Sequence, residues 1–234
     1  MTFDQTKTII IPSETNGKPT VALTRELIKS FIEIDKAERI VIPDTVTAIG
    51  YGAFSYCRSL ISVEIPDSVV SIGAGAFSGC DRLKELKIPR NATSIDSGPF
   101  ENAFSGAANL ERIDVSSDNV AYQSIDGVLY SKDGKTLVAV PNGRQGVFVV
   151  PNSVTEIGTN SFLDCKLLTG VAIPNSVTRI GFRAFNNCKN LVDLEIPKSV
   201  AYIDWYPFEG CDKLDVKIPA SATVAWQDLA AHWD

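Results

Sequence analysis

The sequence predicts an α/β fold, rich in β-structure, in which units of about 23 residues stack into one solenoid. The first observation is a proline that recurs every 23 residues on both sides of the middle of the chain. The second is a phenylalanine 11 residues after such a proline, followed by a cysteine 14 residues after it. The positions are Pro43, Pro66, Pro151, Pro174 and Pro197, with Phe54, Phe77, Phe162, Phe185 and Phe208, and with Cys57, Cys80, Cys165, Cys188 and Cys211. A fixed period in the twenties is typical of stacked supersecondary units.

Each unit divides into three parts. A segment such as VTAI places apolar residues around a polar pair, and a Gly or Asp then turns the chain. The pattern GxxAFxxC spaces its apolar residues like one short helical turn. An alternating segment such as Val63-Glu64-Ile65 predicts a strand with one buried face. The proline closes this strand because it cannot donate to a β-ladder.

The repeats divide a single solenoid domain into five segments. Residues 1–42 predict an N-terminal cap with a degenerate repeat, in which Thr24 is the expected N-cap of a helix. Residues 43–115 and 147–218 carry the repeats. Residues 116–146 interrupt them with DGVLYSKDGKTLVAV, a predicted β-hairpin that we expect to project from the edge of the stack. Residues 219–234 predict a C-terminal cap helix.

Composition excludes several classes of partner. The net charge is −6, the isoelectric point is about 4.9, and there is no basic stripe, so we expect neither nucleic acid nor an anionic membrane surface as partner. No apolar run approaches the roughly 20 residues that a membrane-spanning helix needs. The N-terminus shows no charged leader before an apolar segment, so no signal peptide is visible.

The consensus IPxSVTxIGxxAFxxCxxLxxVxIP resembles the BspA-like subclass of leucine-rich repeats. The insert SSDNVAYQSIDGVLYSKDGKTLVAVP and the leading segment IIIPSETNGKP also resemble segments of that family, and the likeness covers residues 9–225. The resemblance implies a right-handed solenoid with a curved parallel sheet. It also implies a surface-displayed or secreted bacterial protein, several of whose relatives look like adhesins that bind host proteins. It supplies no catalytic residues.

The cysteines and the one histidine suggest chemistry at first sight. Cysteines 23 residues apart lack the clustering that a zinc site needs, so we expect no metal and no cofactor. We interpret the cysteines as a ladder of buried thiols, with a disulfide such as Cys57–Cys80 or Cys165–Cys188 as the alternative. His232 has no nucleophile motif near it and is expected to belong to the C-terminal cap.

The outward face of the predicted strands carries more information. Opposite charges on successive units form the expected pairs Glu85–Arg112, Glu64–Lys87, Lys87–Asp114 and Glu195–Lys217. Between them lies a row without charge, Val147, Val149, Gly170 and Ala172. This row is either a contact surface for a partner or a surface that the insert covers. On the next unit, Asp193 and Glu195 share one face at a spacing that glycoside hydrolysis could use.

We therefore expect a protein-binding, adhesin-like module that is not an enzyme, acts as a monomer, and contacts a host matrix or surface protein. One alternative is a spacer that displays something else and has no binding site of its own. A second is a carbohydrate-active enzyme that uses the acid pair Asp193 and Glu195. The candidate partner-binding residues are Val147, Val149, Ala172, Arg179, Phe182, Tyr122 and Tyr130.

Overall fold

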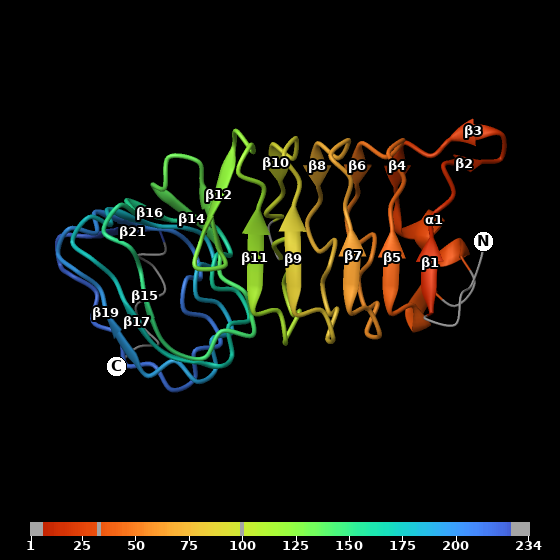
Figure 1. The fold of residues 1–234 in the computed structure, drawn as a ribbon. Helices are drawn as coiled ribbons and strands as arrows, with labels where there is room; N and C mark the ends of the chain where they lie inside the picture. Colours follow the sequence, from red (N-terminus) through yellow and green to blue (C-terminus); the bar gives the residue numbers. More distant parts are fainter. Residues whose placement is uncertain (1–6, 32–33, 99–100, 226–234) are drawn as a thin grey trace.

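The computed structural model describes residues 7–31, 34–98 and 101–225, which coil into a solenoid built mainly of short parallel strands (Figure 1). Each turn of the coil contributes one strand to a first ladder and one to a second ladder. A loop of consecutive turns joins each second-ladder strand to the next first-ladder strand. The predicted β-rich solenoid is confirmed, because successive turns within each block of repeats pair in parallel register.

The first ladder contains the strands that the alternating segments predicted. They are β1 (Thr8–Ile10), β5 (Arg39–Val41), β7 (Ser62–Glu64), β9 (Glu85–Ile88), β11 (Arg112–Val115), β15 (Gly146–Val149), β17 (Leu168–Ala172) and β19 (Asp193–Glu195). They pair in the orders β1-β5-β7, β9-β11 and β15-β17-β19. Strands β7 and β9 lie side by side, but the insert separates β11 from β15.

The second ladder consists of the VTxI segments, which sequence reasoning read only as a turn in the chain. Its strands are β4 (Ala22–Leu23), β6 (Ala48–Ile49), β8 (Ser71–Ile72), β10 (Ser94–Ile95), β14 (Thr136–Ala139), β16 (Glu156–Ile157), β18 (Arg179–Ile180), β20 (Tyr202–Ile203) and β21 (Thr223–Val224). They pair as β10-β8-β6-β4 and as β14-β16-β18-β20-β21.

The loop side differs from the expected short helix. In the turn of Phe54, the N–H groups of Gly52, Phe54 and Tyr56 donate to carbonyls of the next turn at 3.0, 2.8 and 2.7 Å. Positive φ angles of 56° at Gly52 and 61° at Tyr56 interrupt any helix. The segment is therefore a run of β-turns whose backbone bonds to the neighbouring turn.

Phenylalanine and cysteine fill the centre of each turn. The rings of Phe162 and Phe185 stack with centroids 4.7 Å apart, and Phe185 and Phe208 follow at 5.7 Å. Each cysteine lies beside its phenylalanine, and the thiol of Cys188 donates to the carbonyl of Phe162 at 3.1 Å. All the cysteines are buried and free, which confirms the ladder of thiols and excludes the two disulfides considered above.

The N-terminus closes the first turn. Helix α1 (Arg25–Ser30) has Thr24 as its N-cap, as predicted, and the Thr24 side chain accepts a bond from the Leu27 N–H at 3.1 Å. A 3₁₀ turn, η1 (Ile34–Lys36), follows it. Strands β2 (Glu14–Thr15) and β3 (Lys18–Pro19) form a small hairpin beyond the stack. The expected C-terminal cap residues Trp226, Leu229, His232 and Trp233 lie outside the described residues.

The insert is part of the core, which corrects the expectation that it projects from the edge. Strand β13 (Val128–Ser131) pairs antiparallel with β14 and with β12 (Tyr122–Ile125). Leu129 and Ala139 pack into the core of the N-terminal turns, whereas Tyr130 and Leu137 pack into the core of the C-terminal turns. The β13–β14 hairpin is therefore a wall shared by two hydrophobic cores.

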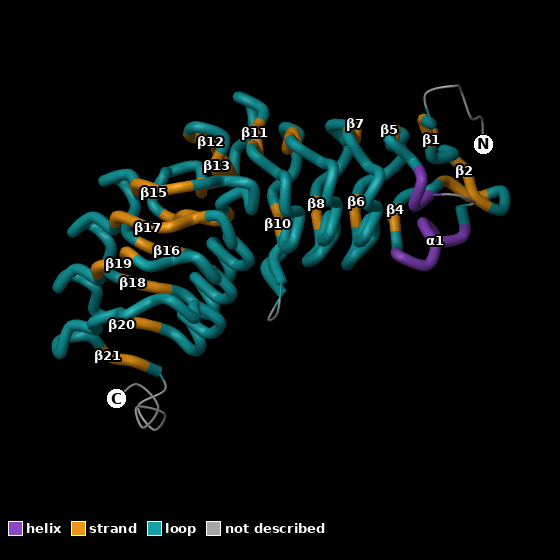
Figure 2. Tube along the Cα trace, turned by 90° about the horizontal axis from the view of Figure 1, so that it is seen from below, coloured by secondary structure: helices purple, strands orange, loops and turns teal. Residues whose placement is uncertain are grey.

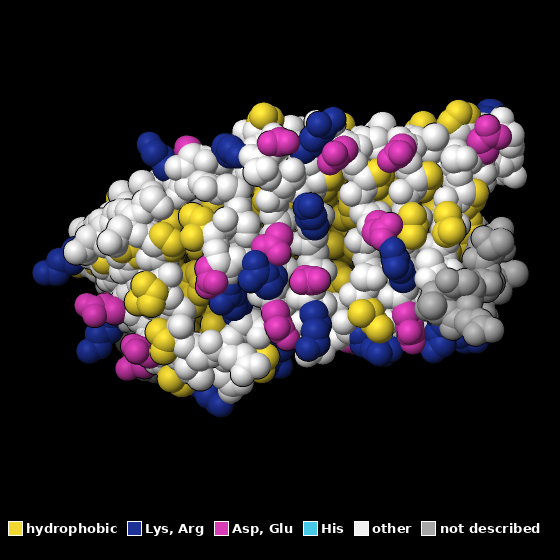
Figure 3. Space-filling model, in the orientation of Figure 1, with side chains coloured by type: hydrophobic (Ala, Val, Ile, Leu, Met, Phe, Trp, Pro, Cys, Tyr) yellow, Lys and Arg dark blue, Asp and Glu magenta, His cyan; other side chains and the backbone are white. Residues whose placement is uncertain are grey.

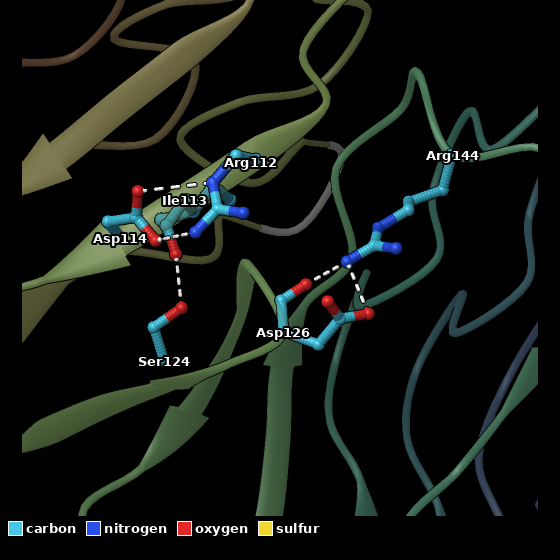
Figure 4. Close-up of polar contacts among 6 residues, drawn as sticks. All are labelled: Arg112, Ile113, Asp114, Ser124, Asp126 and Arg144. Carbon is cyan, nitrogen blue, oxygen red and sulfur yellow. Dashed lines mark hydrogen bonds and ion pairs between the residues drawn. The ribbon is translucent and has the colours of Figure 1, made fainter.

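The stack changes direction at this wall (Figure 2). On the loop side the two blocks of turns touch directly, because the Asn102 side chain donates to the Asn160 carbonyl at 2.7 Å. On the strand side the turn at Asp126 lies against β11, and Arg144 bonds to the carbonyl and carboxylate of Asp126 (Figure 4). The insert thus acts as a wedge that opens the first ladder between β11 and β15.

Candidate functional site

The uncharged row lies on the first ladder beside this wedge. The register of β15 and β17 places Val147 opposite Gly170 and Val149 opposite Ala172. Val147 is 63% exposed and Val149 is 69% exposed, so the insert does not cover them. Ala172 is exposed as well, whereas Gly170 is buried beneath the flanking Val147 and Asp193 side chains. We call these four uncharged residues the neutral row, and its solvent-facing side chains are those of Val147, Val149 and Ala172.

Strand β19 borders the neutral row with two carboxylates. Its register places Asp193 next to Gly170 and Glu195 next to Ala172. Neither carboxylate is part of an ion pair among the described residues. A depression of about 500 Å³ runs from Val147 across this border to Lys198. The surface thus combines an apolar floor with an acidic rim formed by Asp193 and Glu195, and Lys198 lines the end beyond them.

The N-terminal part of the same ladder is different. Charged side chains of both signs gather over β5 to β11, among hydrophobic ones, whereas the side chains over β15 are hydrophobic (Figure 3). Of the charged pairs expected from the sequence, Glu85–Arg112 and Lys87–Asp114 are neighbours in register, and neither is an ion pair among the described residues. No strand register joins Glu64 to Lys87 or Glu195 to Lys217 in that part of the chain. Arg112 instead pairs with Asp114 on its own strand at 2.8 Å, because both side chains leave the same face.

Arg179 and Phe182 lie apart from the neutral row. Arg179 is on β18 of the second ladder, where it bridges Glu156 at 3.3 Å and Asp204 at 3.0 Å. Phe182 is in the loop after β18, and its ring packs edge-on against Tyr206 at 6.2 Å. These two residues already have structural contacts, so the sequence-based grouping with Val147 is not reproduced.

Tyr122 and Tyr130 of the insert serve the scaffold. Tyr130 is 1% exposed, so it is no surface residue. Burial also raises its pKa to about 12. The Tyr122 hydroxyl accepts a hydrogen bond from the Ile95 N–H at 3.0 Å and so extends the second ladder beyond β10. Of the residues proposed from the sequence, only Val147, Val149 and Ala172 form one exposed surface.

The thiols are placed for packing rather than for reaction. Burial raises the pKa of Cys57 to about 11 and that of Cys165 to about 12, whereas a reactive cysteine needs a lowered pKa and access to solvent. The pKa of Cys211 is lowered by its hydrogen bond with Cys188, but this thiol is buried in the core. In the part of the chain that the structure describes, no group of His, Cys, Asp and Glu side chains is arranged to hold a metal ion.

The acid pair on β19 is exposed on an open face. Both Asp193 and Glu195 are solvent-exposed, as their positions on the outward face of β19 require. A catalytic pair of carboxyls needs different environments, because burial must hold the proton on the one that acts as acid. The two residues share one environment and differ in neither burial nor partners. Their geometry favours recognition of a positive charge over glycoside chemistry.

Sequence reasoning missed a second hollow, on the loop side. A cleft of about 330 Å³ lies where the two blocks of turns meet, between Tyr56, Arg58 and Asp81 on one block and Asp164 on the other. Three of its four charged side chains are paired, Arg58 with Asp81 at 3.6 Å and Asp164 with Lys166 at 3.0 Å, and the fourth is Glu101. No motif in the sequence indicated it, because it depends on the direction change at the wall.

Comparison with known proteins agrees with this architecture. A family model described as BspA type leucine rich repeat region matches in six copies, over residues 28–130 and 146–227. A leucine rich cell surface protein from Faecalibacterium prausnitzii A2-165 is similar in structure, with 26% identity, a TM-score of 0.54, and coverage of 93% of this chain and 83% of that one.

The pneumococcal vaccine antigen PcpA shares the fold, with 20% identity, a TM-score of 0.64, and coverage of 95% of this chain and 69% of that one. No curated protein matches the chain significantly. None of the described helices has the length and apolar composition to cross a membrane.

Proposed function

From the premise that this chain belongs to the BspA-type leucine-rich repeat family, we propose that it is a protein-binding module whose contact surface is the neutral row with its acidic rim. The family supports a role in protein interaction or as a scaffold. The observation that carries the proposal is that Val147, Val149 and Ala172 are exposed side by side, next to strands whose outward residues are mostly charged. A contiguous exposed apolar patch with a polar rim is typical of an interaction site.

The acidic rim specifies what such a partner presents. Asp193 and Glu195 lack ion-pair partners among the described residues, so a cationic side chain would gain two carboxylates without displacing an existing bridge. The methylene groups of a lysine or arginine would cover Val147 and Ala172 at the same time. We place the protein at the cell surface or in secreted form, and the description of the similar Faecalibacterium prausnitzii protein as a cell surface protein supports the first of these.

The test introduces negative charge into the neutral row. Deleting residues 116–144 would remove the shared wall, so substitutions are the cleaner experiment. The double variant V149E/A172E and the control S62E, at an equally exposed first-ladder position, would be titrated against a panel of immobilised matrix and serum proteins. We expect V149E/A172E to weaken binding of a wild-type ligand at least about tenfold, or about 1.4 kcal/mol, and S62E to leave it unchanged.

An undiminished affinity of V149E/A172E for a protein that the wild type binds would exclude the neutral row as contact surface. A wild type that binds no member of the panel would instead favour the spacer alternative.

A further inference from the structure

Strand β15 lies at an open edge of its sheet. The sheet is ordered β15-β17-β19, and within the described residues no strand pairs with the side of β15 that faces β11. In every other part of the first ladder after β1, a neighbouring strand lies on that side. The wedge of the insert accounts for the difference.

The direction of the backbone groups follows from the bonds to β17. Gly146 donates to the Leu167 carbonyl at 3.2 Å, and Val150 donates to the Ala172 carbonyl at 3.0 Å. Successive residues of a strand direct their N–H and C=O groups to opposite sides. The N–H and C=O groups of Val147 and Val149 therefore point away from β17, toward the open edge.

The facing edge of β11 is closed by the insert (Figure 4). The Ile113 N–H donates to the Gly127 carbonyl at 2.8 Å, and the Ile113 carbonyl accepts a bond from the Ser124 hydroxyl at 2.7 Å. The insert thus satisfies the edge of β11 and leaves the edge of β15 without a pairing strand among the described residues. The same region leaves the inward side chain of Phe148 only partly buried, whereas Ile113 and Val171 at equivalent positions are buried.

We infer that β15 accepts an extended segment of a partner protein as an added parallel strand, with an apolar side chain of that segment covering Phe148. This inference rests on the proposed function and specifies how the partner binds beside the neutral row. Strand addition takes its affinity from main-chain hydrogen bonds and its specificity from alternate side chains. The residues 146–150 carry no charge or proline of the kind that protects sheet edges.

The surroundings of the edge favour one thin segment over a second copy of this chain. The Gly143 N–H donates to the Leu110 carbonyl at 2.8 Å, and Arg144 contacts Asp126, so both blocks stay close beside the open edge. An extended segment one strand wide needs less room beside these contacts than a second solenoid does.

A peptide of this chain's own ladder is a suitable probe. The peptide RLKELKIP copies residues 82–89, whose strand β9 already has a parallel neighbour in β11. In that pairing the Arg112 N–H donates to the Lys84 carbonyl and the Ser116 N–H donates to the Ile88 carbonyl. Every second residue of β9 therefore directs its backbone groups to β11, so the amides of Leu86 and Ile88 face that neighbour. The control peptide is therefore the same sequence N-methylated at those two amides, which keeps the side chains and blocks strand pairing.

Residue-resolved amide exchange by NMR gives the readout. In the free protein we expect the amides of Val147 and Val149 to exchange about tenfold or more faster than those of Phe148 and Val150. Saturating RLKELKIP should slow them at least about tenfold, and the N-methylated peptide should not. The variant V149P should lose the effect while keeping the fold, because proline is tolerated where a missing N–H faces outward from an edge strand. V149T is its matched control.

Two results would overturn the inference. One is equal exchange at Val147 and Phe148 in the free protein, or no slowing by the peptide. The other is a dimer in light scattering that V149P dissociates, since β15 would then pair with a second copy.

The experiments distinguish a failure of the neutral-row proposal from a failure of the strand-addition proposal. If V149E/A172E abolishes protein binding while the peptide leaves the Val147 and Val149 amides unchanged, the neutral row stands and strand addition is wrong. If the peptide slows exchange of the Val147 and Val149 amides while V149E/A172E leaves protein binding unaffected, strand addition stands and the neutral row is wrong.

Discussion

The thiol of Cys211 donates a hydrogen bond to the backbone carbonyl of Phe185 in the preceding turn, with sulfur and oxygen 3.0 Å apart. Cys80 and Cys188 repeat this relationship with Phe54 and Phe162 at 3.2 and 3.1 Å. A cysteine therefore does two things at this position: it fills a small apolar space and it supplies a donor to a buried carbonyl. Cys57 makes no such bond among the described residues.

The first prediction separates these two contributions. C188A should lower the free energy of unfolding by about 1–2 kcal/mol, because it removes a buried hydrogen bond and leaves a small cavity. C57A should cost less, since it removes only the packing. Urea denaturation of both variants provides the comparison, and equal losses would show that the thiol hydrogen bond contributes nothing.

The second prediction concerns the glycine that follows several second-ladder strands, such as Gly73 after β8. A Cβ atom on Gly73 would lie 2.7 Å from the backbone nitrogen of Tyr51 in the preceding turn. G73A should therefore push two turns apart and cost about 1–3 kcal/mol, as overpacking does. G17A is the control, because Gly17 has a φ of 72° but no atom within 4 Å of its Cβ position. A spacing effect requires the larger loss at Gly73 in thermal and urea melts.

The third prediction concerns the entry to the insert. The buried Asn119 side chain donates to the carbonyls of Pro89 and Ala92 at 2.8 Å each and accepts bonds from the Ala121 and Tyr122 N–H groups. N119A would leave these groups unsatisfied, so we expect a loss of about 2–4 kcal/mol. N190A removes a half-buried asparagine whose hydrogen bond to the Lys166 carbonyl is exposed to solvent, and it should cost under about 1 kcal/mol. If the free energy of unfolding from urea denaturation falls no further for N119A than for N190A, water must replace the hydrogen bonds of the Asn119 side chain.

The fourth prediction is a loss of stability at high pH. Burial raises the pKa of Cys57 from an ordinary 9.0 to about 11 and that of Cys165 to about 12. Below pH 9 both states hold these protons. Above it the unfolded chain releases them first, so the folded state binds more protons. Stability should therefore fall between pH 9 and 11 by about 1.4 kcal/mol per pH unit for each thiol.

The matched measurement uses the double variant C57A/C165A, which is less stable at pH 7 but should lose stability less steeply above pH 9. Urea midpoints collected at several pH values give both slopes. Parallel curves for the wild type and the variant would show that other groups, such as Tyr130, account for the alkaline loss.

The 23-residue period was sufficient to predict the first ladder and the core, because each position of a repeat occupies the same place in every turn. That is why Val147 and Val149 were found to share a surface with Ala172. The second ladder was missed because its strands, such as Ala48–Ile49, are too short to show alternation. Arg179 and Phe182 were grouped wrongly with the neutral row because they follow the proline, outside the first-ladder strand.

The insert shows a different limit. The run Val128–Ser131 was read as part of a projecting hairpin, but Leu129 faces one core and Tyr130 the other. An alternating pattern predicts a strand with two distinct faces. It does not indicate what covers each face, and here the answer depends on two blocks of turns that lie far apart in sequence.

The β13–β14 hairpin shared by the two cores also affects how the protein unfolds. If either block separates from this hairpin, apolar side chains of the other block become exposed, so we expect the unfolding of the two blocks to be coupled. Repeat arrays often lose cooperativity as they lengthen, since each unit contacts only those beside it. In this chain the interruption of the repeat is the element that makes the two halves unfold as one.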